Sequence, residues 1–330
     1  MIDISIIIPV YNRPEEVAAL LFSLTKQTDS EFEVVIVEDG SVTDCKEIAN
    51  IYRQQLNLAY YSKENSGPGL SRNYGARKAK GNYFIFFDSD CEIPPHYIDT
   101  VRKRLVEHYT HAFGGPDRAD ASFTSTQKAI NYAMTSFFTT GGIRGQRTSM
   151  EKFHPRSFNM GLSKVAFEKT GGFSPMRFGE DIDLSIRIFE VGLSVQLIEA
   201  AYVYHKRRTD FKKFFKQVYN SGIARINLYK LHPSSLKVVH LLPSVFLVST
   251  LVLFFLSFLD PVFLSPILIL AILLFVDALI KNKLLTIAGL SVVASFIQLS
   301  GYGAGFIAGV WNRLILGKED YQAFSKTFYK

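Results

Sequence analysis

The amino-acid sequence predicts an α/β domain with a mainly parallel, doubly wound sheet, followed by apolar helices that cross a membrane. Three observations support this prediction. Apolar, β-branched runs alternate with amphipathic helical segments over residues 1–205, basic residues concentrate at 206–240, and charged side chains almost disappear at 241–312. Alternating strands and helices favour parallel pairing with right-handed crossovers, and about 20 uncharged residues are long enough to cross a bilayer.

The first strand is expected at Ile4–Val10, because a continuous apolar run is typical of a strand covered on both faces. A helix follows from Arg13, with Pro14 in its first turn. Further strands and helices are then expected alternately at 32–37, 42–54, 58–61, 71–80 and 83–87. Ligands of such sheets bind at the carboxyl ends of the strands, so the polar residues that follow each strand are the candidate site.

Beyond Pro94 the alternation is less regular. The remaining elements expected in the domain are a helix at 95–108, a strand at 112–114, a Gly- and Thr-rich loop at 139–149, a further segment at 159–163, a helix at 181–189, and strands at 195–198 and 202–204. The two cysteines, Cys45 and Cys91, are too few for a disulfide framework and are expected to be reduced packing residues.

The basic residues are concentrated directly before the apolar segments. Nine of the 37 Lys and Arg residues lie at 201–240, against the single acid Asp210. This placement indicates attraction to anionic membrane lipid and not to nucleic acid. Apolar residues recur there at helical spacing with lysines between them, which favours an interfacial amphipathic helix, with a helix packed on the protein as the alternative. These residues are Phe211, Phe214, Phe215 and Val218.

Three uncharged or nearly uncharged segments are predicted to span the membrane, and a short tail follows them. The spans are expected at 241–259, 261–280 and 284–310, and the tail at 313–330. No signal peptide is expected at the N-terminus, so the first domain is expected in the cytoplasm. The chain is therefore expected to be a multi-pass protein of the cell (inner) membrane.

The third apolar segment leaves two alternatives open. Lys281 and Lys283 favour a cytoplasmic position for the turn before it, because cytoplasmic loops carry an excess of Lys and Arg. A full third crossing would place Arg313 and Lys318 outside, against this rule. Otherwise the glycine-rich sequence at 301–305 breaks the segment and makes it re-entrant.

Acidic residues follow several of the predicted strands. Asp39 could accept hydrogen bonds from a nucleobase or ribose, with a simple turn as the alternative. Asp88 and Asp90 could share a hard divalent cation, because two unpaired acids beside an apolar core are otherwise costly. Glu180 and Asp181 begin a helix, so they either complement its dipole or supply a general base for an acceptor hydroxyl.

Seven short motifs occur in a characteristic order along the chain. They are Pro9-Val10-Tyr11-Asn12, Gln27-Thr28, Val37-Glu38-Asp39-Gly40-Ser41, Arg72-Asn73-Tyr74-Gly75-Ala76, Asp88-Ser89-Asp90, Gly171-Gly172-Phe173 and Gly179-Glu180-Asp181-Ile182-Asp183-Leu184. In this order they resemble family 2 glycosyltransferases of the GT-A fold, over about residues 1–220. The resemblance implies a GT-A domain, a Rossmann-like mixed sheet, that transfers a sugar with inversion from a UDP- or GDP-sugar.

The resemblance also implies roles on the donor side. Asp90 would hold Mg²⁺ or Mn²⁺ on the diphosphate, Asp88 would contact ribose or metal, and Asp39 would bind the nucleoside. Further donor contacts are implied for Pro9, Tyr11, Glu15, Arg72 and Ser89. His205, after a late strand, resembles a third metal ligand, with a structural histidine as the alternative.

On the acceptor side the resemblance implies a catalytic pair and a set of shaping residues. Asp181 would act as the base, beside Glu180. Acceptor or phosphate contacts are implied for Asn159, Met160, Arg144 and Arg147. The two arginines could clamp a phosphate, and a solvated basic loop is the alternative.

We therefore expect a membrane-attached, metal-dependent enzyme of the hexosyltransferase type. It would move one sugar to a hydroxyl of a lipid-linked or membrane-proximal glycan acceptor in surface polysaccharide or glycolipid biosynthesis. A processive polysaccharide synthase is an alternative, but the QxxRW motif of such enzymes is missing after Gln217. An inactive nucleotide-sugar-binding membrane scaffold is another, and the retention of Asp39, Asp88, Asp90 and Asp181 argues against it.

Overall fold

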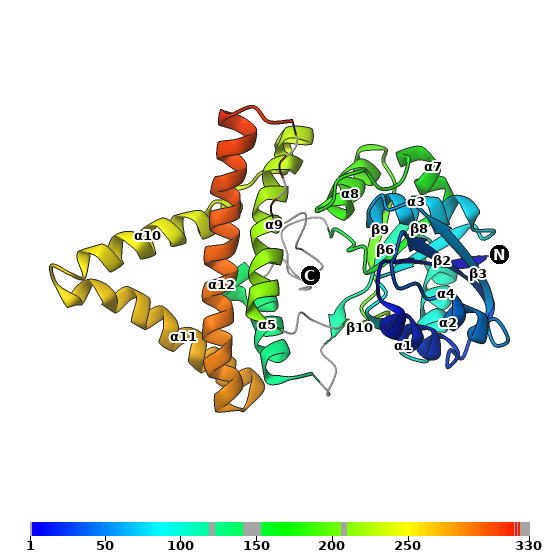
Figure 1. Ribbon diagram of the computed structural model, residues 1–330, viewed down its shortest axis with the longest axis horizontal. Helices are drawn as coiled ribbons and strands as arrows, with labels where there is room; N and C mark the ends of the chain where they lie inside the picture. The colour runs from blue at the N-terminus through cyan, green and yellow to red at the C-terminus, as the bar shows by residue number, and fades with distance from the viewer. Residues whose placement is uncertain are drawn as a thin grey trace. The chain divides into compact units, whose positions relative to one another are not determined.

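The computed structural model describes residues 2–118, 123–140, 153–205, 210–319, 321 and 323. The chain forms two compact units, coloured by residue number in Figure 1. Unit 1 comprises Met1–Asp120 and Lys152–Lys206, and unit 2 comprises Ala121–Glu151 and Arg207–Lys330. The described residues 123–140 lie within the expected N-terminal domain in sequence but belong to the same unit as the C-terminal helices.

Unit 1 is built on a seven-stranded mixed sheet with the order β3-β2-β1-β4-β8-β6-β9. The strands are β1 (Ile4–Val10), β2 (Phe32–Asp39), β3 (Asn57–Lys63), β4 (Tyr83–Phe87), β6 (Ala112–Gly114), β8 (Asn159–Ser163) and β9 (Val195–Leu197). The first four strands are parallel, as predicted, whereas β8 pairs antiparallel with both β4 and β6. The expected alternation of strands and helices is therefore confirmed where the sequence pattern was strongest.

Helices cover both faces of this sheet and bury both sides of its central strands. Ile6 and Ile8 of β1 pack with α1 (Pro14–Leu24), α2 (Lys46–Tyr52) and α4 (Tyr97–Glu107). Ile7 points to the other face and packs with α3 (Pro68–Lys78), α7 (Lys164–Thr170) and α8 (Glu180–Glu190). Successive side chains of a strand point to opposite faces, so an apolar run such as β1 is stable only when both faces are covered.

A small second sheet positions His205, one of the predicted metal ligands. Strand β10 (Val203–His205) pairs antiparallel with β5 (Cys91–Glu92) and parallel with β7 (Asp117–Arg118). In this register His205 lies opposite Cys91. The pairing therefore brings a histidine from late in the unit beside Asp90, directly after the end of β4.

Unit 2 is helical. Its helices are α5 (Ser125–Thr135), α6 (Phe137–Thr140), α9 (Phe211–Leu231), α10 (Leu242–Leu256), α11 (Ser265–Asn282) and α12 (Leu285–Gly309). Short 3₁₀ helices are η1 (Pro233–Ser235), η2 (Val238–His240) and η3 (Pro261–Leu264), and η4 (Val310–Ile315) is a π-helical segment that follows α12 directly. Three helical stretches are long and apolar enough to cross a membrane, at Val238–Leu256, Pro261–Asn282 and Leu285–Ile315. They coincide with the predicted apolar segments.

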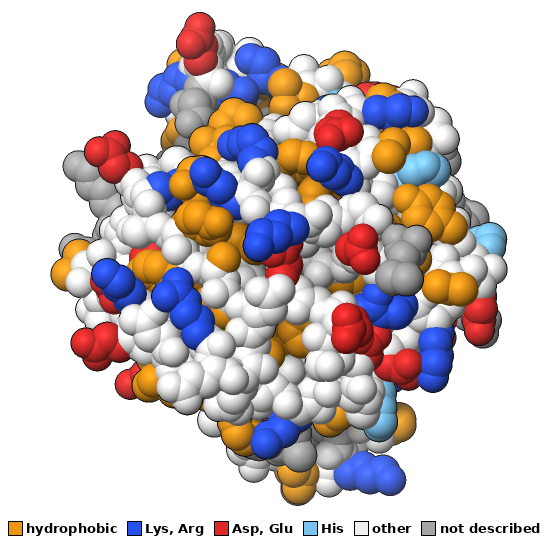
Figure 2. All heavy atoms as spheres, turned by 90° about the vertical axis from the view of Figure 1, so that its right-hand side faces the viewer, with side chains coloured by type: hydrophobic (Ala, Val, Ile, Leu, Met, Phe, Trp, Pro, Cys, Tyr) orange, Lys and Arg blue, Asp and Glu red, His pale blue; other side chains and the backbone are white. Residues whose placement is uncertain are grey.

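Figure 2 shows a different surface on unit 1, where acidic and basic side chains are interspersed.

The structure bears on two expectations for unit 2. The glycine-rich sequence at 301–305 does not break the third apolar segment, because α12 continues through it as a regular helix. Phe214 and Val218 of α9 are buried with residues of α5 and α12, which agrees with the alternative of a packing helix for these two residues. Lys212 and Lys213 on the same helix are exposed, and the interfacial position of α9 stays a prediction.

Glycines allow α9 and α12 to approach each other at backbone contact. A Cβ atom at Gly305 would lie 1.9 Å from the carbonyl oxygen of Tyr219, and one at Gly222 would lie 2.3 Å from that of Tyr302. Small residues at such crossings are typical of helix pairs in membrane proteins. Helices α9 and α12 therefore pack as a close pair.

We predict that Gly305→Ala destabilises unit 2 by about 1–3 kcal/mol, because the added methyl group would overlap the α9 backbone. Gly289→Ala is the matched control on the same helix, since a Cβ there meets nothing within 4 Å. It should be neutral or stabilising by up to about 1 kcal/mol. Thermal unfolding of the detergent-solubilised full chain measures both. Equal midpoints for the two variants would contradict the close packing.

Candidate active site

The candidate site lies at the carboxyl ends of β1, β2 and β4 in unit 1. Asp39 is the last residue of β2, and Asp88 follows the last residue of β4. Strands β2 and β4 flank β1 on opposite sides. The strand order therefore reverses at β1: β2 and β3 follow on one side of it, and β4 lies on the other. Such a switch point is where open α/β sheets bind ligands.

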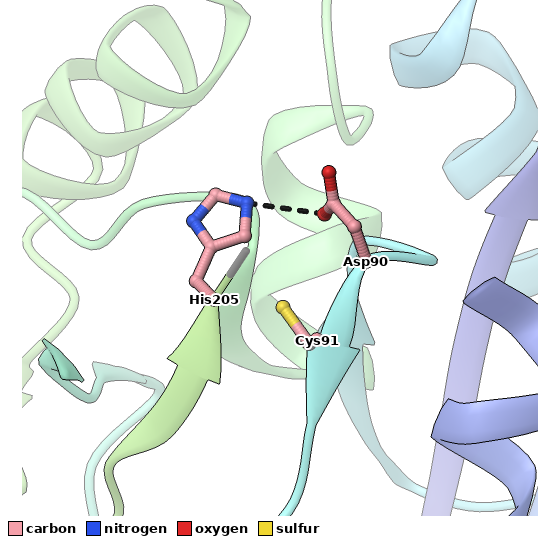
Figure 3. A group of neighbouring side chains, drawn as sticks. All are labelled: Asp90, Cys91 and His205. Atoms are coloured by element: carbon pink, nitrogen blue, oxygen red, sulfur yellow. Dashed lines mark ion pairs between the residues drawn. The ribbon is translucent and has the colours of Figure 1, made fainter. Parts of the chain in front are cut away.

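Asp90 and His205 point toward each other, as Figure 3 shows. His205 Nε2 lies 3.1 Å from Asp90 Oδ1, and the Arg13 guanidinium lies 2.7 Å from Asp90 Oδ2. The ring of Phe158 stacks on the His205 imidazole at 4.8 Å between centroids, which helps to orient it. The predicted ligands Asp90 and His205 are thus brought together by the pairing of β5 with β10.

These donor atoms fit a divalent cation. A carboxylate oxygen suits Mg²⁺ or Mn²⁺, and an imidazole nitrogen is a common ligand of transition-metal ions. The Cys91 thiol lies in the same group, with all three possible ligand atoms within 4.8 Å of one another. However, burial raises the pKa of this thiol well above its ordinary value, and its sulfur donates to the Phe158 carbonyl oxygen at 3.6 Å. Cys91 is therefore a packing residue, as predicted.

Arg72 joins the two acidic motifs of the site. Its side chain projects from α3, where one guanidinium nitrogen lies 2.6 Å from Asp88 Oδ1 and another lies 3.1 Å from Glu180 Oε1. Arg72 is only 2% exposed, and the guanidinium also lies 5.2 Å from the Phe173 ring centroid. Arg72 thus holds the end of β4 and the start of α8 together, and the donor contact predicted for it from the sequence stays a prediction.

The catalytic pair predicted from the sequence begins α8. Glu180 is buried, and burial together with the negative charge of Asp181 raises its pKa to about 7, although the Arg72 charge acts in the opposite direction. The Asp181 carboxylate accepts a hydrogen bond from the Ser157 backbone N–H at 3.4 Å, and the Arg156 guanidinium lies 3.7 Å from it. Asp181 is therefore held at the helix start beside the buried Arg72–Glu180 pair.

Asp39 has partners within the chain. Its carboxylate accepts hydrogen bonds from the backbone N–H groups of Ser66 and Gly67, both at 2.9 Å, and forms an ion pair with Lys63. These contacts hold the loop that leads from β3 into α3. A nucleoside bound at Asp39, as predicted, would have to share these hydrogen bonds or replace some of them.

The other predicted donor residues surround the same strand ends. Pro9 lies in β1 and Tyr11 directly after it, both half-buried, and Glu15 is exposed in the first turn of α1. Ser89 is buried between the two aspartates of the Asp88-Ser89-Asp90 motif. They lie at one edge of the sheet, and their contact with a donor remains a prediction.

The predicted acceptor residues are not placed as expected. Asn159 is fully buried, donates to the Ala201 carbonyl oxygen at 2.8 Å and accepts a hydrogen bond from the Tyr97 hydroxyl. Met160 is fully buried in the core. Both belong to β8, whose two faces are covered, so an acceptor contact of either side chain would require local rearrangement and stays a prediction. Arg144 and Arg147 lie outside the described residues.

Sequence reasoning missed three cations that contact predicted acids: Arg13 at Asp90, Lys63 at Asp39 and Arg156 at Asp181. Arg13 could have been found, since it follows the carboxyl end of β1. Lys63 likewise ends β3. Arg156 carries no such signal, because its contact depends on how the chain before β8 folds back toward α8.

The sequence matches that of a known family in its first half. The model of glycosyl transferase family 2 matches residues 5–171. An uncharacterized glycosyltransferase from Haemophilus influenzae is 31% identical over 196 residues, which cover 57% of this chain and 62% of that protein. Another from Rickettsia felis is 40% identical over 105 residues, covering 32% of this chain and 17% of that protein. The chain thus spans less than two thirds of the length of either relative.

The fold is similar to that of a solved structure. A mannosyltransferase from Pyrobaculum calidifontis, in complex with GDP-Man and Mn²⁺, superimposes with a TM-score of 0.58 at 15% identity. The match covers 95% of this chain and 90% of that chain. It confirms the predicted architecture, a GT-A-like mixed sheet domain followed by long apolar helices.

We predict that stability depends on pH through Glu180. A raised carboxyl pKa favours the protonated folded state, so this stabilisation is complete below pH 4.5 and is lost as the pH rises to about 7. Relative to Glu180→Gln, the metal-free wild type should lose on the order of 1–3 kcal/mol across this window. Chemical unfolding of both proteins between pH 4 and 8 measures the difference, and a difference independent of pH would refute the raised pKa.

Proposed function

The chain belongs to family 2 of the glycosyl transferases, and we propose that it is a membrane-attached, metal-dependent enzyme that moves a sugar, with inversion, from a UDP- or GDP-sugar to an acceptor hydroxyl. One observation carries this proposal. The Asp88-Ser89-Asp90 motif and the Glu180-Asp181 pair, about 90 residues apart in sequence, are joined through the Arg72 side chain.

The charged residues that follow β4 support a metal site on the donor side. Asp90, His205 and Asp88 would hold Mg²⁺ or Mn²⁺, and the nitrogen ligand favours Mn²⁺. Such a cation stabilises the negative charge that develops on a departing nucleoside diphosphate. Arg13 would adjust its contact with Asp90 when the cation binds, because both compete for the same carboxylate. The Mn²⁺ and GDP-Man bound by the Pyrobaculum enzyme agree with this donor class.

Single displacement with inversion needs a base on the face opposite the leaving group. Asp181 comes from α8, whereas the metal carboxylates follow β4, so the two functions are placed on different segments. Asp181 would accept the proton of the acceptor hydroxyl, and the Ser157 amide and Arg156 would hold its carboxylate in position. Arg72 would hold the base motif at a constant distance from the donor motif.

The acceptor is proposed to be lipid-linked or membrane-proximal, in surface polysaccharide or glycolipid biosynthesis. The three long apolar helices support this assignment, because a tethered enzyme meets lipid-anchored substrates in two dimensions. Transfer of one sugar is favoured over processive synthesis because QxxRW is missing after Gln217. The length of the product made by purified enzyme separates the two.

Asp90→Ala should abolish the gain in donor affinity that Mn²⁺ provides, which we expect to be at least about tenfold, or about 1.4 kcal/mol. Calorimetric titration of a panel of UDP- and GDP-sugars, with and without Mn²⁺, measures this gain. Glu47→Ala, which removes an exposed acid of α2, is the control and should keep it. A metal-dependent gain that persists in Asp90→Ala would exclude the proposed metal site.

Asp181→Asn should leave donor affinity within about threefold and reduce sugar transfer by about 10²–10⁴-fold, because the amide cannot accept the hydroxyl proton. Transfer is measured with radiolabelled donor and a membrane lipid extract as the acceptor source. Glu47→Gln is the matched control for loss of one carboxylate and should transfer at the wild-type rate. Full transfer by Asp181→Asn would remove this residue from the role of base.

A further inference from the structure

Helices α10 and α11 form an apolar hairpin. Figure 1 shows them leaving separate parts of α12 and converging at their far ends, near residues 257–264. The described parts of the chain bury only 6% of the apolar stretch that contains α10 and 11% of the one that contains α11. Their exposed side chains include Val248, Phe255, Leu268, Ile272 and Val276. A surface of this length and composition matches the hydrocarbon core of a bilayer.

Helix α12 runs across the base of this hairpin. At the start of α10, Ser244 donates a hydrogen bond to the Gly303 carbonyl oxygen at 3.3 Å. At the end of α11, Ala278 packs in a buried cluster with Ala288. These two contacts with α12 are 15 residues apart, about 22 Å along its axis. Because α12 contacts the start of α10 and the end of α11 at points this far apart, it runs across these two helices and not parallel to them.

The α9 helix accompanies α12 over most of its length. Phe214 shares a buried cluster with Ala294, and a Cβ atom at Gly309 would lie 3.1 Å from Ile226 Cγ1. About 20 residues are needed to cross the hydrocarbon core, and any 20 within Leu285–Ile315 overlap this contact with α9. A crossing by α12 would therefore carry part of α9 into the lipid.

The composition of α9 opposes such a position. Basic residues are spread from its first turn to its last turn: Lys212, Lys213, Lys216, Arg225 and Lys230. A charged side chain at the centre of a membrane helix is energetically costly. In the head-group layer the same side chains are attracted to anionic lipid.

The charges that flank α12 support the same arrangement. Lys281 and Lys283 precede the helix, and Arg313 and Lys318 follow it. A third crossing would separate these pairs, whereas a helix along the membrane surface keeps both on one side, as the distribution of Lys and Arg favours. Near the base of α11, Asp277 accepts hydrogen bonds from Tyr132 at 2.6 Å and Lys281 at 2.9 Å. This polar cluster fits the head-group layer.

We propose that only the α10–α11 hairpin enters the hydrocarbon core, and that α12 lies along the anionic head-group layer together with α5 and α9. The hairpin enters and leaves the bilayer on the same side. The α9–α12 pair, with its basic side chains, then contacts the lipid head groups. The α10–α11 hairpin contacts the lipid acyl chains. This arrangement does not depend on the proposed catalytic activity.

The proposal places the basic residues before and after α12 on the same side of the membrane, and this can be tested by labelling. Lys283→Cys and Lys318→Cys are labelled with a membrane-impermeant maleimide in intact cells and in inverted membrane vesicles. Both cysteines should react from the same face. Native Cys45 and Cys91 are each 1% exposed, so the wild type gives the background. Labelling of the two engineered cysteines from opposite faces would overturn the proposal.

The depth of α12 provides a second measurement. Trp311 is the only tryptophan of the chain, so Trp311→Phe gives a background for single tryptophans at the exposed positions Val293 and Ile307. These are 14 residues apart, about 21 Å. Quenching by phospholipids brominated at different depths should place both tryptophans at the same shallow depth.

Leu242→Trp and Leu251→Trp on α10 are the matched control pair in the same background. Both positions are exposed and lie nine residues apart, about 14 Å along the helix. Leu251→Trp should lie markedly deeper than Leu242→Trp, because it is nearer the middle of the bilayer. Any 20-residue crossing within Leu285–Ile315 includes position 293 or position 307. If either the Val293 or the Ile307 variant lay below the head-group level, α12 would cross the bilayer and the proposal would be wrong.

Discussion

A buried arginine holds the two halves of the candidate active site together. Arg72 is 2% exposed and contacts one carboxylate on each side, Asp88 and Glu180. A buried ion pair is expensive to desolvate and is strongly destabilising when one partner is removed. The end of β4 and the start of α8 are therefore coupled, and the spacing between the proposed donor and base motifs depends on this one side chain.

The Arg72–Glu180 contact lies beside a second carboxylate, that of Asp181. Burial and Asp181 raise the pKa of Glu180 to about 7, while Arg72 opposes the increase. Asp181 is a half-buried neighbour with its own contacts, the Ser157 amide and Arg156. Two adjacent carboxylates thus have different surroundings, and the proposed division of roles, with Asp181 as the base and Glu180 bound to Arg72, relies on this difference.

The parts of the fold that could be predicted from the sequence are those with local signals. The run Ile4–Val10 and the strand before Asp88 have the continuous apolar pattern of covered parallel strands, and Asp39 and Asp88 lie at the predicted carboxyl ends of β2 and β4. What could not be predicted depends on distant pairing. The antiparallel insertion of β8 buries Asn159 and Met160, and the register of β10 on β5 alone decides that His205 meets Asp90.

The C-terminal helices illustrate the same limit. Hydropathy identified all three apolar segments, because length and composition are local properties. The partner of each helix is not a local property. Helix α12 lies in the most buried of the three apolar stretches, at 39%, because α5 and α9 pack along it, whereas α10 and α11 have few such neighbours. Its stretch has a lower mean hydropathy, 1.5 against 2.3 and 2.7, but is still long and apolar enough to cross a membrane. Hydropathy alone therefore does not separate a lipid-facing helix from one that faces protein, and the charges on the packed neighbour provide the further information.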